Sequence, residues 1–568
     1  MQNHATGLLA CLTIVLSATA AVSDPTATSA TAPADDGLSA TEKDLQWFRD
    51  AKFGLFIHWG PVSLTASEIG FSRAGEHRGS PGEPGPIPAA EYDNLYKRFN
   101  PVKFDAKQWV AIAKNAGMKY VVFVAKHLDG FCMFDSRHTH YKITNSPFGR
   151  DVAAELAKAC HEAGLRLGFY YQPSDWYNPD RFTANHARYV EYMHNQLREL
   201  CTNYGPVSII WFDAYDSEAD VNRYDAPGLF RMIRRLQPGV LINNRLYLPG
   251  DFDTPEQTVG NFQTDRPWET CMTIGSIWAW GGPTDHVKSY ESLLRTLIRC
   301  AVNGGNLLLN VGPMPTGEID PRNVERLKQV GEWTSRYGDS IYGTRGGPYI
   351  LRWWGGSTYK GNKVYLHLLR WDEDVLTLPP LPRKVVKVSA LTGGKPSVTQ
   401  EAEVIRLRLE PADRHALDTI LVLELDGPLP VMPPIRVGHE QTSLTRGRQA
   451  TGSNVYMRMK EVGPGMAVDG DSSTRWATDA DVTSAWLEVD LGEPATFSRA
   501  VIQEAFDRVE EFELQYKDGD EWRTWARGSK LGAEFVTRFP PVTARFVRLN
   551  INKSIGGPTI CEFELYPR

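Results

Sequence analysis

The sequence predicts an α/β protein in which a (β/α)8-like TIM barrel is followed by a β-sandwich and by an independent C-terminal β domain. Three observations lead to this prediction. The chain has 568 residues, which is too long for one hydrophobic core. From about residue 40 to 345, apolar strand-like runs alternate with helical patterns, the order typical of a parallel sheet. Beyond Tyr349, short strand-like runs follow one another without helices between them.

Apolar runs in the first part of the chain end in polar or aromatic residues. Residues 207–213 (V-S-I-I-W-F-D) form such a run and place Trp211 and Asp213 at its end. Four further runs, at residues 53–60, 119–127, 166–172 and 240–245, end in His58 and Trp59, His127, Tyr170 and Tyr171, and Arg245. Barrel enzymes carry their chemistry at the carboxyl ends of the strands, so we expect these side chains to line one pocket.

Helical patterns separate these runs. Residues 104–116, 151–163 and 187–204 have helical periodicity, and a glycine follows each pattern as a stop signal. Residues 306–312 (N-L-L-L-N-V-G) are expected to form the strand that closes the barrel. A doubly wound open sheet is the alternative, but no glycine-rich phosphate loop opens any of the helices.

The remaining boundaries follow from composition. We expect a barrel over residues 41–348, a β-sandwich over 349–428, and an independent β domain over 437–568. The strands expected in the two β regions cover residues 363–370, 385–391, 419–425, 485–491, 499–503, 511–516 and 544–551.

The N-terminus has the pattern of an export signal. An apolar stretch over residues 7–16 is followed by small residues, which predicts a signal peptide over 1–23 and a disordered spacer over 24–40. We therefore expect a secreted or periplasmic protein. The stretch Leu8-Leu9-Ala10-Cys11 resembles a lipoprotein box, and lipid anchoring is the minor alternative. No later run reaches the roughly 18 apolar residues of a membrane span.

Composition excludes some classes of partner and site. The net charge is −6 and no basic block stands out, which argues against nucleic acid. The 16 Trp and 22 Tyr residues weakly favour carbohydrate, because aromatic faces pack against sugar C–H groups. The seven cysteines show no zinc-type spacing. Buried thiols are expected at four apolar positions, Cys132, Cys160, Cys201 and Cys300.

Carboxylates are the residues that fit chemistry in this pocket. Two suitably placed carboxyl groups, one nucleophile and one acid/base, suffice to cleave a glycosidic bond. Asp213 is the first candidate. Its partner is either Glu256, in the loop motif D-F-D-T-P-E-Q, or Glu269, whose neighbour Trp268 would raise a carboxyl pKa.

The histidines admit two interpretations. His58 and His127 fit hydroxyl-binding groups or metal ligands, and the pair His138 and His140 has H-x-H spacing. That pair lies in a loop rather than at a strand end, so no metal site is predicted. Arg245 is expected to pair with a carboxylate or to bind a sugar hydroxyl.

Several long motifs occur in an order that resembles one enzyme family. They are F-G-L-F-I-H-W-G, K-H-L-D-G-F-C-M-F-D-S, Y-K-I-T-N-S-P-F-G-R-D, W-F-D, T-P-E-Q, W-E-T-C-M-T-I and G-G-N-L-L-L-N-V-G-P. Over residues 44–350 the chain resembles the α-L-fucosidases of glycoside hydrolase family 29. The resemblance implies a catalytic (β/α)8-like barrel, a following β-sandwich and a retaining double displacement that needs no cofactor.

The resemblance also implies roles for single residues. Asp213 matches the nucleophile and Glu256 the acid/base, with Glu269 still open for the second role. The positions that match or adjoin the fucose pocket are His58, Trp59, His127, Tyr171, Trp211, Arg245 and Trp278. One departure is Leu128, which stands where the family more often has a second histidine.

The C-terminal region resembles a discoidin-like, family 32 carbohydrate-binding module, and this resemblance implies a second β-sandwich of the jelly-roll kind. The supporting segments are A-V-D-G-D-S-S-T-R-W (467–476), W-L-E-V-D-L-G (486–492) and A-R-F-V-R-L (544–549). Trp476 is expected to be a core residue, and the fold is compatible with a structural calcium ion. Together the resemblances imply an exo-α-L-fucosidase acting on fucosylated glycans, with a leaning toward α-1,3/4 linkages. The alternatives are a catalytically silent, fucose-binding lectin-like protein and another retaining exo-glycosidase such as an α-galactosidase.

Overall fold

The structure is a computed structural model, and it describes residues 37–74, 85–214, 222–350, 354–371, 374–437, 443–471, 474–532 and 534–567. The expected signal peptide, the lipoprotein-like stretch and the spacer up to residue 36 lie outside the described residues. None of the helices in the described part is both long and apolar enough to cross a membrane.

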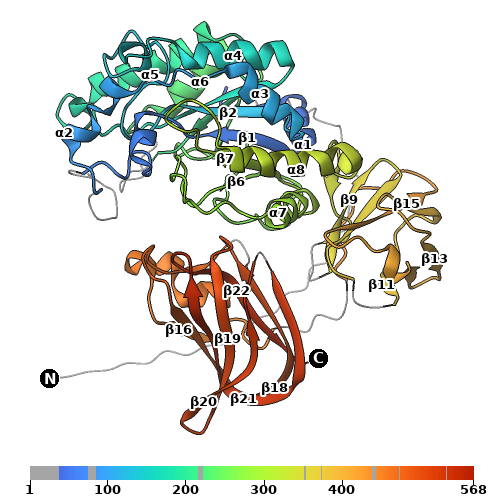
Figure 1. The fold of residues 1–568 in the computed structure, drawn as a ribbon. Coiled ribbons are helices and arrows are strands. Elements are labelled where there is room, and N and C mark those ends of the chain that lie inside the picture. The colour runs from blue at the N-terminus through green and yellow to red at the C-terminus, as the bar shows by residue number, and fades with distance from the viewer. Residues whose placement is uncertain are drawn as a thin grey trace, which may run out of the picture. The chain divides into compact units, whose positions relative to one another are not determined.

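A seven-stranded, all-parallel sheet forms the first part of the molecule (Figure 1). Its order is β5-β4-β3-β2-β1-β7-β6. Its strands are β1 (Phe53–Ile57), β2 (Tyr120–Lys126), β3 (Arg166–Tyr171), β4 (Ile209–Phe212), β5 (Leu241–Ile242), β6 (Glu269–Thr273) and β7 (Asn306–Val311). The expected closing strand pairs with β1, as predicted.

The gap between β5 and β6 is filled by an irregular stretch, residues 252–256, which we call the closing segment. Phe252 forms a parallel bridge with Asn243, just beyond β5. At the other edge, Glu256 bridges Cys271 of β6, and Asp253 bridges Trp268 just before that strand. The segment therefore takes the place of a strand in a barrel, and the expectation of a (β/α)8-like fold is confirmed.

Helices follow the strands and cover the outside of the sheet (Figure 1). Side-chain oxygens of Asp105 and Asp151 cap the amide groups that open α3 and α4, and Gly164 ends α4 in the left-handed conformation. The helices are α1 (Glu42–Ala51), α2 (Ala89–Tyr92), α3 (Ala106–Asn115), α4 (Val152–Ala163), α5 (His186–Asn203), α6 (Ala226–Leu236), α7 (Tyr290–Val302) and α8 (Pro321–Tyr337).

Side chains of the parallel strands alternate between two apolar clusters. One cluster lies within the sheet's concave side and includes Phe56, Tyr120, Tyr170 and Trp211. The other lies between the sheet and its helices and includes Tyr171. Neighbouring residues of one strand point to opposite faces, so this alternation decides which side chain of each strand can reach a pocket.

Two further β regions follow, each with its own apolar cluster. The first has the sheets β12-β15-β10-β9-β8 and β11-β14-β13, and the second the sheet β17-β22-β18-β21-β19-β20 with β16 beside β18. Trp476 is fully buried in the second cluster, as expected. The strands of the first region are β8 (Arg345–Gly346), β9 (Gly355–Lys360), β10 (Lys363–Leu368), β11 (Leu376–Leu378), β12 (Val385–Ala390), β13 (Ser397–Gln400), β14 (Ile405–Arg408) and β15 (Thr419–Leu425). Those of the second are β16 (Gln449–Gly452), β17 (Trp476–Ala477), β18 (Ala485–Glu504), β19 (Val509–Asp518), β20 (Glu521–Gly528), β21 (Phe535–Ser554) and β22 (Thr559–Tyr566).

The cysteines in the described part of the chain are buried thiols. Cys132, Cys160, Cys201 and Cys300 are free and buried, as predicted, and so are Cys271 and Cys561. Burial raises the pKa of the Cys300 thiol to about 12. These thiols are therefore protonated at neutral pH and behave as small apolar side chains.

Candidate active site

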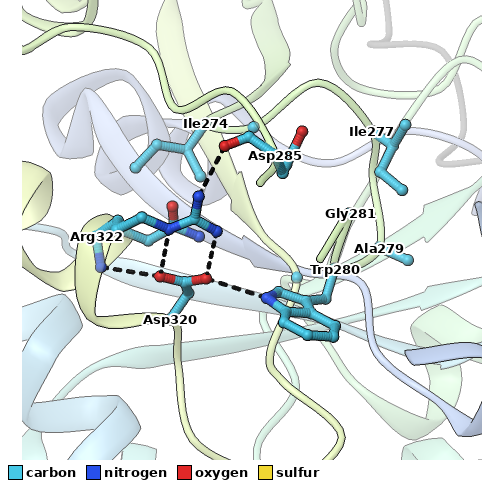
Figure 2. A pocket seen from close by; sticks show the side chains of 11 residues that line it. Ile274, Ile277, Ala279, Trp280, Gly281, Asp285, Asp320 and Arg322 are labelled. Atoms are coloured by element: carbon cyan, nitrogen blue, oxygen red, sulfur yellow. Dashed lines mark hydrogen bonds and ion pairs between the residues drawn. The ribbon is translucent and has the colours of Figure 1, made fainter. Parts of the chain in front are cut away.

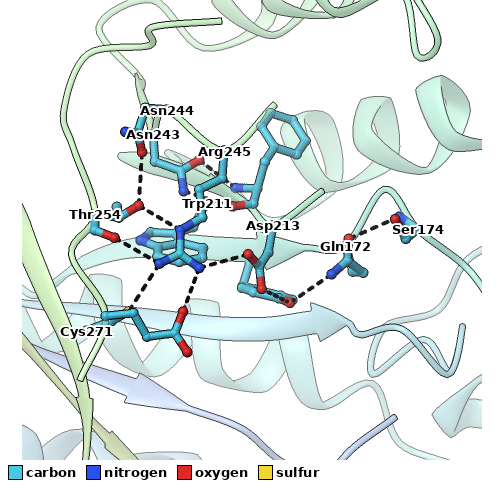
Figure 3. A network of polar contacts seen from close by, with 12 residues as sticks. Gln172, Ser174, Trp211, Asp213, Asn243, Asn244, Arg245, Thr254 and Cys271 are labelled. Carbon is cyan, nitrogen blue, oxygen red and sulfur yellow. Dashed lines mark hydrogen bonds and ion pairs between the residues drawn. The ribbon is translucent and has the colours of Figure 1, made fainter. Parts of the chain in front are cut away.

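Asp213 lies directly after β4, where the apolar run stops, and its carboxylate is held from two sides (Figure 3). Arg245 donates to one oxygen from Nη1 at 2.9 Å. The hydroxyl of Tyr170 donates to the other oxygen at 3.0 Å. A charged and a neutral donor thus fix the orientation of this carboxylate at the end of the sheet.

Glu256 comes to the same guanidinium from the closing segment. Its Oε2 accepts from Nη1 of Arg245 at 2.8 Å, so one nitrogen contacts both Glu256 and Asp213. The two carboxylates are therefore neighbours, although their positions in the chain are 43 apart. The side chain of Glu256 is 39% exposed, which leaves it open to a molecule in the pocket.

Arg245 is locked in place by contacts along its whole fork (Figure 3). Its Nε donates to Oγ1 of Thr254 and its Nη2 to the Thr254 carbonyl, both at 2.8 Å. The guanidinium also lies over the ring of Trp211, 4.8 Å from the centroid. Five donors in a rigid plane allow this residue to hold two carboxylates and the closing segment at once.

Two histidines, His58 and His127, lie beside Tyr170, next to the carboxylate pair. Nδ1 of His58 lies 2.6 Å from Oδ1 of Asn310, and the His127 ring stacks on Tyr170 with centroids 5.4 Å apart. Burial lowers the pKa of His127 to about 3, and burial together with His127 lowers the pKa of His58 well below its usual value. Both imidazoles are neutral at pH 7, so each offers one donor and one acceptor. The ring of Trp278 lies 4.9 Å from that of His58.

Glu68 is a third carboxylate near this cluster, and sequence reasoning missed it. It accepts from the amides of Trp278, Ile69 and Ala279 at 2.8, 2.9 and 3.3 Å, and so holds the loop that carries Trp278. Burial raises its pKa to about 7; the three amides oppose this, and nearby Glu256 adds to it. It lies in the short stretch S-E-I-G, and no strand-end pattern pointed to it.

A small cavity lies beside the same loop (Figure 2). Asp320 accepts from Trp280 Nε1 at 3.0 Å and from Arg322, whose other contacts include the Asp285 carbonyl. None of the residues that contact the pair Asp213 and Glu256 lines it. We interpret the contacts around this cavity as structural, because they anchor the loop that carries Trp278.

Glu269 does not face the pocket. It is the first residue of β6 rather than part of a loop, and it is 0% exposed. Its carboxyl accepts from Trp211 Nε1 at 3.2 Å and from the hydroxyl of Tyr120. Burial raises its pKa to about 7, against the effect of these two hydrogen bonds. Glu269 therefore supports Trp211 from below, while Glu256 shares Arg245 with Asp213.

Two of the expected pocket residues point the other way. The hydroxyl of Tyr171 donates to Gln196 of α5 at 2.7 Å, and Nε1 of Trp59 donates to the Met314 carbonyl at 3.1 Å. Both belong to the cluster between the sheet and the helices. The expectations for Tyr171 and Trp59 were therefore wrong, because they ignored the alternation of side chains along a strand. Tyr170 takes the position that Tyr171 was expected to hold.

Leu128 is buried, and its carbonyl accepts from the Trp176 amide at 2.8 Å. Within the described residues, no group of three or more His, Cys, Asp or Glu side chains has the arrangement of a metal site. In the C-terminal region, burial raises the pKa of Glu562 to about 9, and the nearby carboxylates of Glu564 and Asp469 add to this effect. The structural calcium ion that the resemblance suggests for this region stays a prediction.

Comparisons with known proteins agree with this geometry. The family model "Alpha-L-fucosidase" matches residues 18–339, and the model "F5/8 type C domain" matches residues 449–564. Plasma alpha-L-fucosidase of Homo sapiens is 30% identical over 362 residues, which is 57% of this chain and 76% of that protein.

Solved structures give the same answer. Alpha-L-fucosidase isoenzyme 1 from Paenibacillus thiaminolyticus is 35% identical with a TM-score of 0.62, covering 68% of this chain and 99% of its own. A family 29 alpha-L-fucosidase from Bacteroides thetaiotaomicron, trapped as a covalent intermediate, is 28% identical with a TM-score of 0.61, covering 68% and 97%. The family match spans more than half of the chain and includes the carboxylate pair. This chain belongs to the alpha-L-fucosidases of glycoside hydrolase family 29, and an F5/8 type C domain follows its catalytic part.

Proposed function

We propose that this protein is a retaining exo-α-L-fucosidase that removes terminal α-L-fucose by double displacement. The observation that carries the proposal is the shared contact of Asp213 and Glu256 with one nitrogen of Arg245. Oxygens at 2.9 and 2.8 Å from one atom lie no more than about 6 Å apart, which fits the roughly 5–5.5 Å of retaining enzymes. Inverting enzymes need roughly 6.5–9.5 Å, to admit a water molecule.

In the proposed reaction Asp213 is the nucleophile. Its carboxylate attacks the anomeric carbon while Glu256 gives its proton to the departing glycosidic oxygen. Glu256 then takes a proton from water, which cleaves the fucosyl-enzyme ester and restores both carboxyl groups. Arg245 orients the pair, and Tyr170 holds the second oxygen of the nucleophile. Carboxyl groups alone carry every step, so no step requires a cofactor.

The surrounding residues fit a small deoxy sugar. The neutral His58 donates from Nδ1 to Asn310, which leaves its Nε2 to accept from a sugar hydroxyl, and the neutral His127 can also bind a hydroxyl. The Trp278 ring adds an apolar wall suited to the methyl group of fucose. An α-galactosidase would need room there for a hydroxymethyl group instead.

The natural substrate and its location are finer parts of the proposal. The motif D-F-D-T-P-E-Q favours α-1,3/4-linked fucose on oligosaccharides or glycoconjugates, and the F5/8 type C region would hold the enzyme on such glycans. The apolar N-terminal stretch supports export to the periplasm or the medium, with lipid anchoring as the minor alternative.

The test is release of fucose from oligosaccharides of each linkage by the full-length protein and by Asp213→Ala. We expect release by the wild type, preferentially from α-1,3/4 linkages, and near-complete loss in the variant. A matched control is Asp518→Ala, which removes an exposed carboxylate paired with Arg523. Glycan binding without release by the wild type would instead support the lectin-like alternative.

The assignment of the acid/base has its own test. In Glu256→Ala, hydrolysis of substrates with poor leaving groups should fall by about 10²–10⁴-fold. Fucosides with very acidic leaving groups should lose far less at the glycosylation step, and azide should accelerate their turnover and yield fucosyl azide. The same pattern in Glu269→Ala, but not in Glu256→Ala, would reverse the assignment.

A further inference from the structure

Gln257, the residue after Glu256, combines two unusual features. Its backbone is in the left-handed region with φ 56°, which side-chain-bearing residues rarely adopt. The residue is nevertheless buried, with only 7% of its surface exposed. A strained backbone is kept in a folded protein only where surrounding contacts impose it, and such strain is often found at functional sites.

The amide of Gln257 pairs with Thr273, the last residue of β6. Its Oε1 accepts from the Thr273 backbone N–H at 3.2 Å, and its Nε2 donates to Oγ1 of Thr273 at 3.3 Å. Its backbone N–H also donates to the Cys271 carbonyl at 2.9 Å. The side chain thus continues the pairing with β6 beyond the point where the closing segment turns away.

Thr273 is itself fixed by the buried amino group of Lys288. Nζ of Lys288 donates to the Thr273 carbonyl at 2.6 Å, to its Oγ1 at 3.2 Å and to the Gly275 carbonyl at 3.3 Å. Lys288 is 2% exposed, and its amino group makes all three of these contacts inside the protein. The partner of Gln257 is therefore held rigidly by the chain that follows β6.

We propose that Gln257 is a positioning residue for the acid/base, and that Thr273 and Lys288 form the rigid support to which it is tied. The inference rests on the proposed role of Glu256. The Glu256 side chain is held by Arg245 on one side, while its backbone is held one residue on by Gln257. Together the two contacts fix where the acidic proton meets the glycosidic oxygen, and catalytic groups must be placed within about 0.5 Å.

The test uses variants that loosen this link while keeping the fold. Gln257→Asn keeps an amide on a residue that tolerates the left-handed backbone, but its side chain is one methylene too short to reach Thr273. Thr273→Val removes the hydroxyl at nearly constant shape, and Thr273→Ser returns it. Each variant is checked by its thermal transition before kinetics are measured.

The readout is kcat/KM for two aryl or alkyl fucosides, one with a very acidic leaving group and one whose leaving oxygen needs protonation. We expect Gln257→Asn and Thr273→Val to lose about 10- to 100-fold on the second substrate and little on the first. Thr273→Ser should recover most of the loss, and the basic limb of the pH profile should shift in the two defective variants.

Equal losses on both substrates in folded variants would overturn the proposal, because misplaced acid catalysis is selective for poor leaving groups. Failure of Thr273→Ser to recover activity would overturn it too. Glu256→Ala measured on the same substrates separates this outcome from failure of the proposed function. If Glu256→Ala shows no leaving-group selectivity, the assignment of the acid/base is wrong, whatever Gln257 does.

Discussion

Arg245 contacts both proposed catalytic carboxylates, and its fork shape matters as much as its charge. Lysine keeps the charge but offers one compact ammonium group in place of the plane that reaches Asp213, Glu256 and Thr254 together. Arg245→Lys should therefore lower kcat/KM by about 100-fold or more while the protein stays folded. Arg295→Lys, at a half-buried pair with Glu291 in α7, is the matched control and should retain activity. Full activity in Arg245→Lys would show that charge alone suffices.

The raised pKa of the buried Glu269 should make the stability of the protein, rather than its catalysis, depend on pH. Its pKa is about 7 in the folded protein against an ordinary 4.5, so between these values the folded state holds a proton that the unfolded chain has lost. The stability of the wild type should fall as pH rises through this window. Glu269→Gln mimics the protonated form, and above pH 7 it should be more stable than the wild type by on the order of 3 kcal/mol.

Denaturant unfolding of both proteins at pH 5 and pH 8 measures this difference. The gap between them should be small at pH 5 and large at pH 8. A gap that does not change with pH would mean that Glu269 titrates like an exposed glutamate, and that its burial does not persist in solution.

At the scale of single residues, the sequence predicted some of the site residues and missed others. The strand ends identified Asp213, Arg245, His58 and His127 because the apolar run before each residue is easy to recognise. The choice between Tyr170 and Tyr171 depended on which face of the strand each occupies, and both faces of a barrel strand are apolar. Glu68 gave no signal, because its role comes from amides more than 200 residues away.

At the scale of elements, β1 and β2 depend on a glycine opposite a tyrosine. A Cβ at Gly54 would lie 2.4 Å from ring atoms of Tyr120, which is fully buried and reaches Glu269. Gly54→Ala must displace this ring, at a cost of about 1–3 kcal/mol. Thermal unfolding should show a lower transition temperature, whereas Gly465→Ala, where a Cβ meets nothing within 4 Å, should unfold like the wild type.

The elements that the sequence predicted best are those with continuous apolar runs. The expected strands at residues 166–172 and 306–312 agree with β3 and β7 to within one residue. Two elements were missed for one reason. β6 (E-T-C-M-T) and the closing segment are rich in polar residues, because their side chains serve Trp211, Arg245 and Gln257 instead of an apolar layer. Because these polar side chains make functional contacts, the two elements lack the apolar pattern by which strands are recognised.

For the molecule as a whole, the separate apolar cluster of the C-terminal region indicates that this region folds independently of the rest of the chain. The cluster of the C-terminal region contains residues from 467 to 565 and none from the parallel sheet or its helices. Residues 437–568 should therefore fold alone, with a cooperative thermal transition and dispersed amide signals in NMR spectra. The remaining chain, residues 24–436, should still hydrolyse a small aryl fucoside. A disordered spectrum for the isolated C-terminal part would show that its stability depends on the rest of the chain.

The irregular closure of the barrel has a consequence for how such enzymes diverge. A regular strand fixes the length of chain between its neighbours, whereas residues 252–256 are held by a few isolated bridges. Insertions and deletions there would break no ladder of strand hydrogen bonds, so a second carboxylate can come from another point of this stretch while the nucleophile stays at the end of β4, provided that Thr254 keeps its contacts with Arg245. Laboratory evolution of new linkage preferences should accordingly accept length changes in this stretch more readily than substitutions in the strands beside it.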